Sequence, residues 1–320
     1  MGWVAEMILP IAGFLISLVS VPLLAKLASR WGMLDEPTGE ALKPHEQSTP
    51  LTGGVALLFS WAVVSVVGGL AGLGWEMASI AALSLPGFVL GWVDDAIWKN
   101  RPQTYRPRVK FAAQVLVSLS GGLLFWIAGY GAALQLTPLL LVPILGLLVF
   151  GAMNAVNMQD GIDGNAGLLG VISSAGFAVS SVMLGDRAGL ILALTLLAVL
   201  LGFLVFNWPK ARVFMGDSGS HWLGLMLILL AVRLTHVSGS LLVLPFACGV
   251  LGIPVVDAGL AVLRRLRSNT RLFSGDRGHL YDRLMNRGWR VQRVILVYAA
   301  MHGLLVSCAV ALIALLHART

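Results

Sequence analysis

The stretch AGLILALTLLAVLLGFLVF at residues 188–206 decides the class of fold, because it runs for 19 positions without a charged side chain. A helix needs about 20 apolar residues to cross the hydrocarbon core of a bilayer. Backbone amides and carbonyls find no water in lipid, so a stretch of this kind must be helical. Residues 188–206 therefore predict a transmembrane helix.

The composition extends this prediction to the whole chain. Hydrophobic residues make up 58% of the 320 positions and charged residues only 12%, whereas about 25% of the residues of a soluble domain are charged. We expect an all-α, polytopic integral membrane protein with about ten spans, forming one domain over residues 1–320. The expected spans lie near 3–28, 51–73, 76–93, 109–129, 134–153, 165–184, 187–206, 219–233, 238–263 and 292–317. The stretches at 76–93 and 219–233 are the shortest.

Basic residues indicate how the spans are oriented. Alternate connections, with the adjacent span ends, hold 19 of the 22 Lys and Arg; these connections are 29–50, 94–108, 154–164, 207–218 and 264–291. The positive-inside rule makes this side cytoplasmic and puts both termini outside. The net charge of +7 does not indicate a nucleic-acid partner, because no nucleic-acid-binding motif accompanies it.

The acidic pair Asp94-Asp95 directly follows an apolar stretch. An ionised Asp near hydrocarbon costs about 2.5–3.5 kcal/mol on insertion scales, so the pair needs compensation. A divalent cation, or Lys110 with Arg106 and Arg108, would supply it. Two adjacent carboxylates also titrate apart, which leaves one able to accept a proton. The alternative is a solvated helix end whose Asp residues pair with nearby Arg.

Four side chains with oxygen donors recur at every third position: Asn154, Asn157, Asp160 and Asp163. Positions three apart share a helix face, and glycines after Asp160 are expected to loosen the helix there. An oxygen-rich edge suits Mg²⁺, which takes oxygen ligands and keeps several water ligands that a substrate phosphate can replace. The alternative is an Asx-rich loop that caps the next helix.

The segment Phe214-Met-Gly-Asp217-Ser-Gly-Ser220 immediately precedes another span. Asp217 is a candidate metal ligand, and Asp217 or Ser218 is a candidate cap of a helix whose N-terminus favours phosphate.

The largest polar stretch, 264–291, is expected to form a cytoplasmic substrate-binding loop. It contains Arg277, His279 and Arg283, and Arg side chains bind phosphate oxygens through two parallel hydrogen bonds. Anchoring to anionic lipid is an alternative that explains the arginines at its boundary, but it does not explain His279.

Two kinds of isolated polar residue lie inside or beside the spans. Asp257 lies within an expected span, where an acid is a functional hypothesis by default, and a buried ion pair with Arg264 is the alternative. The histidines His221, His236, His302 and His317 are predicted to serve packing or the interface.

The motifs, taken in this order, resemble the polyprenyl-phosphate N-acetylhexosamine-1-phosphate transferase family. The matching pieces are Gly91-Trp-Val-Asp94-Asp95 with Lys110-Phe111, Asn154-Ala-Val-Asn157-Met-Gln-Asp160-Gly-Ile-Asp163-Gly, Val213-Phe-Met-Gly-Asp217-Ser-Gly-Ser, Asp276-Arg-Gly-His279-Leu, and His45…Thr49-Pro50…Gly53-Gly54. They extend over residues 45 to 283. The branch that uses UDP-N-acetylglucosamine is the closer likeness, and the phospho-N-acetylmuramoyl-pentapeptide transferases are more distant.

The resemblance implies an enzyme of the bacterial inner membrane whose active site faces the cytoplasm. Such an enzyme transfers N-acetylhexosamine 1-phosphate, here N-acetylglucosamine 1-phosphate, from a UDP-sugar to undecaprenyl phosphate and releases UMP. This step initiates a cell-surface polysaccharide such as O-antigen. A homodimer is left open.

The resemblance also implies roles for individual residues. Asp217 and Asn157 would hold Mg²⁺, for which Mn²⁺ can substitute. Asp94, Asp95, Asp160 and Asp163 would serve catalysis. Lys110, Asn154, His45, Arg277, His279 and Arg283 would bind substrate. The chain departs from the family pattern at Tyr281-Asp282, where further histidines are common, and at Asn165, where Leu is usual.

Three alternatives remain at this point. The donor is a different UDP-N-acetyl sugar, or the protein is a cation-coupled transporter, or it is a membrane scaffold without activity. Transporter sites lie near the bilayer midplane, whereas these acids are expected at the cytoplasmic ends of spans.

Overall fold

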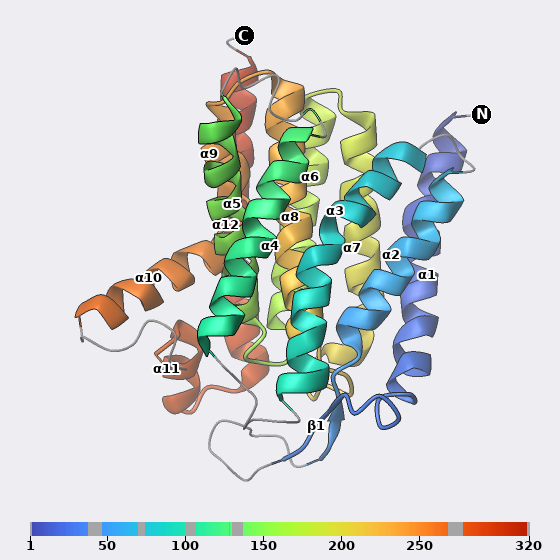
Figure 1. Ribbon diagram of the computed structural model, residues 1–320, viewed down its shortest axis with the longest axis vertical. Coiled ribbons are helices and arrows are strands. Elements are labelled where there is room, and N and C mark those ends of the chain that lie inside the picture. The colour runs from blue at the N-terminus through green and yellow to red at the C-terminus, as the bar shows by residue number, and fades with distance from the viewer. Residues whose placement is uncertain are drawn as a thin grey trace.

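The structure is a computed structural model that describes residues 2–37, 47–69, 74–99, 107–127, 129, 137–267 and 278–318. It is a bundle of long helices that run side by side (Figure 1). Within the described residues the long helices are α1 Gly2–Ala25, α3 Gly74–Val93, α4 Pro107–Ile127, α5 Pro138–Gln159, α6 Asn165–Met183, α7 Arg187–Asn207, α8 Gly216–Ser238 and α12 Val291–His317. The shorter elements are β1 Leu34–Asp35, β2 Thr49–Pro50, α2 Gly53–Gly68, the π-helix η2 Asp94–Trp98, α9 Val243–Gly249, α10 Ile253–Arg267 and α11 Leu280–Asn286.

The all-α polytopic class predicted from the sequence is confirmed. Eight helices among the described residues are long and apolar enough to cross a membrane, and the bent pair α9 and α10 makes nine if it counts as one span. The helix α2 is apolar but only 16 residues long. The two stretches predicted as short spans are longer than expected, because α8 covers 216–238 and α3 with η2 continues to Trp98.

The predicted span at 238–263 is not one straight helix. The chain bends there by 88° between α9 and α10, and α10 projects away from the bundle (Figure 1). Gly252 lies in the bend with a φ of +44°, in the region of positive φ that glycine enters without steric cost. A count of apolar residues cannot detect this break, since the residues on both sides are apolar.

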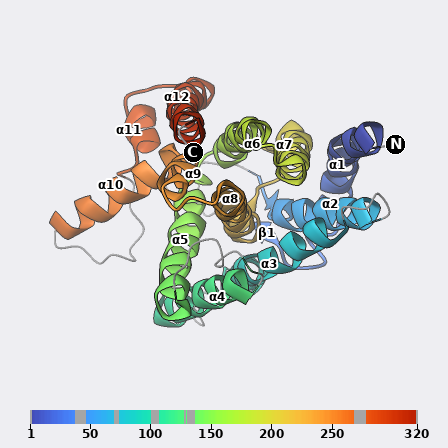
Figure 2. The same cartoon turned by 90° about the horizontal axis from the view of Figure 1, so that it is seen from above.

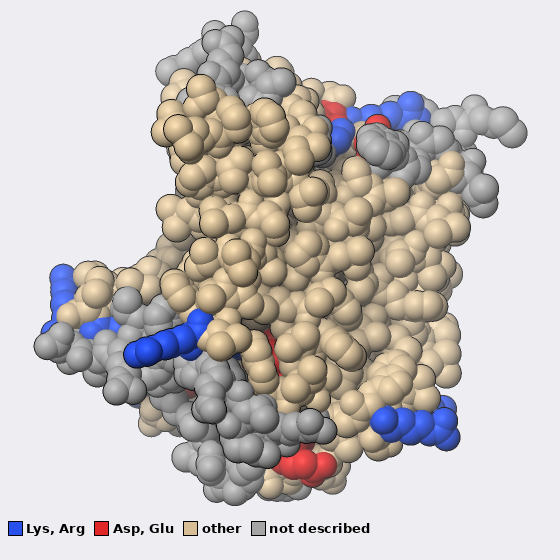
Figure 3. Space-filling model, viewed as in Figure 1, with Lys and Arg blue, Asp and Glu red and all other residues tan. Residues whose placement is uncertain are grey.

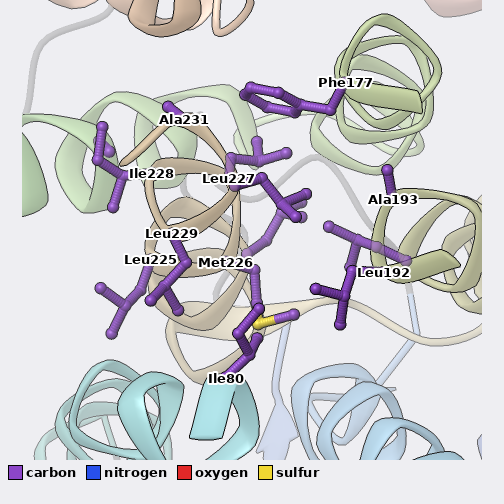
Figure 4. Close-up of a cluster of buried hydrophobic side chains, with 14 of the residues drawn as sticks. Ile80, Phe177, Leu192, Ala193, Leu225, Met226, Leu227, Ile228, Leu229 and Ala231 are labelled. Atoms are coloured by element: carbon purple, nitrogen blue, oxygen red, sulfur yellow. The ribbon is translucent and has the colours of Figure 1, made fainter. Parts of the chain in front are cut away.

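The helix α8 lies in the middle of the bundle when the molecule is seen from above (Figure 2). Side chains on all its sides are buried, including Trp222, Met226 and Leu229. Leucine and methionine side chains of α8 point toward Ile80 of α3, Phe177 of α6 and Leu192 of α7 (Figure 4). A helix that is apolar all round is typical of a buried position, so α8 is the scaffold around which the other helices pack.

Glycines allow other helices to approach α8 closely. A Cβ added at Gly91 of α3 would overlap the backbone of Asp217, and one at Gly54 of α2 would overlap the backbone of Gly219. A Cβ at Gly224 of α8 would lie 2.6 Å from the carbonyl oxygen of Ala152 in α5. Small residues at membrane helix interfaces permit such close packing, and here they bring three helices against α8.

The two ends of the bundle differ. The strand β1 and the helix α11 lie at the end opposite the two chain termini, and α10 leaves the bundle between the two ends (Figure 1). Basic side chains are visible at both ends, and the tan surface between them carries few charges (Figure 3). At the terminal end Arg233 of α8 donates two hydrogen bonds to Asp186, at 2.9 and 2.6 Å, and Asp186 also caps α7 by accepting from the Gly189 N–H.

Candidate active site

The candidate site is built from four segments that are distant in the sequence. They are η2, the first turn of α4, the last turn of α5 and the first turn of α8. All four lie at the end of the bundle that also carries β1 and α11 (Figure 1).

Asp95 holds the start of α8. Its carboxylate accepts the backbone N–H of Asp217 at 3.0 Å and that of Ser218 at 2.8 Å. The first N–H groups of a helix lack intrahelical partners and attract negative charge. Gly216 precedes them with a φ of +73°, and a Cβ on it would lie 2.6 Å from Asp95 Oδ2. Asp95, which is fully buried, therefore caps α8 from a different helix.

Lys110 of α4 joins two of the carboxylates. Its ammonium donates to Asp94 Oδ2 at 2.8 Å and to Asp217 Oδ2 at 2.9 Å. The side chain of Asp94 is 8% exposed and that of Asp217 is 16% exposed. Lys110 thus compensates Asp94 of the acidic pair, as expected, whereas Asp95 is compensated by Lys99. Arg106 lies outside the described residues.

Lys99 forms a second bridge. Its ammonium lies 2.8 Å from Asp95 Oδ1 and 3.7 Å from Asp217 Oδ1. The side chain of Lys99 is 37% exposed. Partial burial lowers the pKa of Lys99, but the charges of Asp95 and Asp217 raise it more, and the pKa ends above its usual value. A raised lysine pKa keeps the charge in place until the pH passes the folded value, so Lys99 stays protonated into the alkaline range.

The last turn of α5 supplies Asn157 and Asp160. The Asn157 amide donates to Asp217 Oδ1 at 3.1 Å and to the Ser220 hydroxyl at 2.9 Å. Burial raises the pKa of Asp160 well above its usual value, and the charges of Asp217 and Asp95 add to this, whereas Lys99 opposes it. Asp160 therefore belongs to the same electrostatic cluster, which we call the acidic cluster and define as Asp94, Asp95, Asp160 and Asp217.

A second layer of polar side chains lies behind Asp217. The ring of His221, which is fully buried, has its Nδ1 2.7 Å from the Asp217 carbonyl oxygen and its Nε2 3.2 Å from Gln114 Nε2. The carbonyl can only accept, so Nδ1 carries the proton and Nε2 accepts from Gln114. Gln114 also donates to Asn154 Oδ1 at 3.3 Å, which places Asn154 beside the site rather than in the acidic cluster.

Asp163 lies on the connection after α5. Its carboxylate accepts the backbone N–H of Ala211 at 2.9 Å, in the loop that leads to α8. The nearby Gly164 has a φ of +75° and donates its N–H to Asn207. The structure thus ends the predicted helical face at Asp160 and uses Asp163 to brace the loop before α8.

His279 lies in a separate buried network. Its Nδ1 is 2.8 Å from Asp257 Oδ2, and the amide of Gln159 donates to the same oxygen at 2.9 Å. Asn165 donates to Gln159 Oε1 at 3.1 Å. The Asp257 carboxylate therefore pairs with His279 and Gln159, whereas a pair with Arg264 was the sequence-based alternative.

The remaining predicted binding residues are distributed as follows. His45 and Arg277 lie outside the described residues. Arg283 is exposed on α11 and donates to the Gly278 carbonyl at 3.1 Å. Of the loop 264–291, the structure describes 264–267 and 278–291.

The donor set of the acidic cluster fits a hard divalent cation by its chemistry. Oxygen atoms of carboxylates are the ligands that Mg²⁺ prefers. The four carboxylates face two ammonium groups, Lys99 and Lys110, which leaves two negative charges in surplus when all are ionised. Among the described residues no three Asp, Glu, His or Cys side chains already converge as a metal site, since Lys110 lies between Asp94 and Asp217.

Sequence reasoning missed four residues of this region. Lys99, Gln114, His221 and Ser220 all contact the site residues. The spacing of Lys99 four positions after Asp95 is a usable signal, because such pairs are neighbours on one helix face. His221 has the same spacing from Asp217, but Gln114 is separated by 107 residues from His221 and carries no local pattern.

Comparison with known proteins shows what this architecture is similar to. Residues 77–235 match the family model described as glycosyl transferase family 4. A relative from Bacillus subtilis, named as a probable undecaprenyl-phosphate N-acetylglucosaminyl 1-phosphate transferase, is 30% identical over 91% of this chain and 82% of its own length. The decaprenyl-phosphate N-acetylglucosaminephosphotransferase of Mycobacterium tuberculosis is 30% identical over 85% of this chain and 73% of its own length. The phospho-N-acetylmuramoyl-pentapeptide-transferase of Moorella thermoacetica is 31% identical over 79% of this chain and 80% of its own length.

The fold and the site thus define a polytopic membrane enzyme with a charged site at one end of its helical bundle. The chain belongs to glycosyl transferase family 4, the polyprenyl-phosphate N-acetylhexosamine-1-phosphate transferases. The resemblance inferred from the order of the motifs is confirmed.

Proposed function

We propose that this protein transfers N-acetylglucosamine 1-phosphate from UDP-N-acetylglucosamine to undecaprenyl phosphate, releasing UMP. The observation that carries the proposal is the convergence on Asp217 of Lys110, Lys99 and Asn157 from three other segments. Two ammonium groups beside four carboxylates suit a reaction in which phosphates and a divalent cation meet. The names of the relatives from Bacillus subtilis and Mycobacterium tuberculosis support the sugar and the prenyl acceptor.

The cofactor in this proposal is Mg²⁺, with Mn²⁺ as a substitute. Asp217 and the side-chain oxygen of Asn157 would hold it. When bound, such an ion withdraws electron density from phosphate oxygens and stabilises a phosphate leaving group.

The reaction replaces one phosphoanhydride by another. An oxygen of the lipid phosphate attacks the phosphorus that bears the sugar, and the bond from that phosphorus to the UMP oxygen breaks. The electron pair leaves with UMP. Because little bond energy is gained, we expect positioning and charge neutralisation to supply most of the rate enhancement.

The residues divide this work by where their side chains lie. Lys110, which touches both Asp94 and Asp217, is suited to hold a phosphate between them. The side chain of Asp94 is 8% exposed, whereas that of Asp95 is fully buried, so we assign to Asp94 the task of orienting or deprotonating the lipid phosphate. Asp95 is committed to the backbone of α8 and acts by holding Asp217.

The site lies at the ends of apolar helices, which lets a prenyl chain stay in lipid while its phosphate reaches the acidic cluster. The basic connections at that end support an orientation toward the cytoplasm, in the inner membrane of a bacterium. The product would be the lipid-linked sugar that initiates a surface polysaccharide.

The test uses purified protein in detergent with UDP-N-acetylglucosamine, undecaprenyl phosphate and Mg²⁺. UMP should appear only when both substrates and the metal are present, and EDTA should abolish it. Asp94→Asn and Asp217→Ala should each lower UMP release by at least about 100-fold, in line with the loss of one electrostatic group from a reaction centre.

A panel of UDP-sugars identifies the donor in the same assay. UMP release with UDP-N-acetylglucosamine should exceed that with UDP-N-acetylgalactosamine or UDP-N-acetylmuramoyl-pentapeptide. Release of UMP in the absence of the prenyl acceptor would contradict the proposed transfer. So would a result in which no UDP-sugar of the panel yields UMP.

A further inference from the structure

Asp257 is a buried acid in α10, just after the bend that breaks the predicted span. It is 4% exposed, and its Oδ2 accepts hydrogen bonds from His279 Nδ1 and from the Gln159 amide. A carboxylate placed among apolar helices is costly unless it is paired. Here the pairing joins three segments of the chain: α10, His279 at the start of α11, and the last turn of α5.

The network around Asp257 extends in both directions. Asn165, the first residue of α6, donates to the Gln159 side chain at 3.1 Å and to the Gln159 carbonyl at 3.2 Å. On the other side, the ring of Tyr281 stacks on that of His279 with centroids 5.3 Å apart. The Tyr281 hydroxyl donates to the Met158 carbonyl at 3.2 Å.

The last turn of α5 is shared between this network and the acidic cluster. Asn157 contacts Asp217, and Asp160 lies in the electrostatic field of Asp217 and Asp95. Met158 and Gln159, which lie between them in the sequence, contact the Asp257 network. A shift of Gln159 therefore moves two residues of the candidate active site.

The bond to Asp257 also fixes the orientation of the His279 ring and the place of a ring proton. A carboxylate that accepts from Nδ1 fixes the ring orientation and puts a proton on Nδ1. In a neutral ring Nε2 then carries no proton and can accept a hydrogen bond from a substrate hydroxyl group.

We propose that Asp257 is a positioning residue for the transfer reaction. It fixes the ring of His279 and, through Gln159, the turn of α5 that carries Asn157 and Asp160. This inference rests on the proposed function for its catalytic consequence, but the positioning itself is a structural property that can be measured separately.

The experiment uses the full-length protein in detergent with Asp257→Asn, which keeps the size of the side chain and removes its charge. Asp186→Asn is the matched control, because Asp186 is also a buried carboxylate that accepts side-chain hydrogen bonds, in its case from Arg233 at the opposite end of the bundle. We expect Asp257→Asn to lower kcat by about 10–100-fold, the range seen when outer-layer partners of site residues are lost. Asp257→Glu, which keeps the carboxylate, should recover part of the rate.

A double-mutant cycle separates positioning from general destabilisation. If Asp257 acts through His279, then Asp257→Asn should cost little further activity in a His279→Gln background. Additive losses in the cycle would overturn the action of Asp257 through His279. A loss of kcat no greater than that of Asp186→Asn at equal thermal stability would overturn the inference as a whole.

Hydrogen exchange gives a readout that does not depend on catalysis. Amides at 157–165 and 279–286 should exchange faster in Asp257→Asn, and those at 187–200 should not. Unchanged exchange at 157–165 would overturn the positioning role even if the enzyme is active. Absence of UMP release by the wild-type protein would instead contradict the proposed function. The comparison of hydrogen exchange between the wild-type protein and Asp257→Asn would still test the positioning role.

Discussion

At the residue scale, Asp95 illustrates how a motif read as catalytic can serve a neighbouring helix. The sequence pairs it with Asp94, and the chemistry of adjacent acids suggests a shared proton. The structure gives the two carboxylates different partners: Asp94 contacts Lys110, whereas Asp95 accepts two backbone N–H groups of α8 and the ammonium of Lys99.

Asp95→Asn should therefore destabilise the protein and also lower its rate of UMP release. An Asn side chain can accept only through its one oxygen, so at least one buried N–H of α8 loses its partner. Such a loss costs about 1–3 kcal/mol in the free energy of unfolding. Thermal unfolding in detergent should show a lower Tm for Asp95→Asn than for Asp94→Asn, and equal Tm values would contradict the capping role.

Lys99 offers a second test at this scale, because it lies beside Asp217 and was not among the residues predicted from the sequence. Lys99→Gln should lower kcat/KM by about 10–100-fold, since it removes a cation next to the carboxylates that meet the substrate phosphates. The matched control is Lys26→Gln, which removes an exposed cation near the end of α1.

The measurement is UMP release by the two variants over a range of donor concentrations. Equal losses in Lys99→Gln and Lys26→Gln would mean that the effect is one of net charge, and that the position of Lys99 has no importance.

At the element scale, the break between α9 and α10 directs α10 away from the bundle and sets Asp257 beside α5. Gly252 makes the break with its φ of +44°, and a Cβ there would lie 2.5 Å from His302 Nδ1. The His302 ring is part of the same joint, since its Nδ1 accepts the Ile253 N–H at 3.2 Å and its Nε2 lies 2.9 Å from the Ser173 hydroxyl. This histidine has the packing role predicted from the sequence, whereas His221 contacts Asp217.

Gly252→Ala should strain the break and crowd His302. We expect a loss of about 1–3 kcal/mol in the free energy of unfolding, the usual cost of a strained backbone position, together with reduced transfer activity. Gly259→Ala in α10 is the control, because a Cβ there meets nothing within 4 Å and alanine favours a helix over glycine by up to about 1 kcal/mol.

Thermal unfolding and UMP release of the two variants decide the point. A Gly252→Ala protein as stable and as active as Gly259→Ala would show that the bend tolerates a side chain, and that its geometry has little effect on the site.

At the scale of the whole molecule, the charges and the helix ends agree on one orientation. The acidic cluster, β1 and α11 lie at one end, and the termini with the Asp186–Arg233 pair lie at the other (Figure 1). The distribution of Lys and Arg predicts that the end with the acidic cluster faces the cytoplasm.

Cysteine labelling in intact cells tests this orientation. In a background with Cys248→Ala and Cys308→Ala, a membrane-impermeant thiol reagent should label Arg187→Cys, which lies at the terminal end. The same reagent should label Ser48→Cys, beside β2 and exposed, only after the membrane is permeabilised. The reverse pattern would place the site outside and rule out a cytoplasmic nucleotide sugar as its donor.

Much of this fold follows from local properties of the chain. Uninterrupted apolar stretches such as 188–206 determine membrane-spanning helices, because lipid leaves the backbone no other partner. The polar motifs fall between these stretches, so their common side follows from counting spans. The helix end after Asp160 also follows from local glycines.

What the sequence by itself determined is therefore the membrane class, the helices and the end of the bundle where the polar motifs lie. The tertiary structure decided which residues meet there: Asp95 caps α8 across 122 residues, Gln114 reaches His221, and Asp257 joins Gln159 to His279. It also decided that the apolar stretch at 238–263 bends at Gly252. The physical reason is that hydropathy and helix formation depend on neighbours along the chain, whereas these contacts depend on how closely distant helices pack against α8.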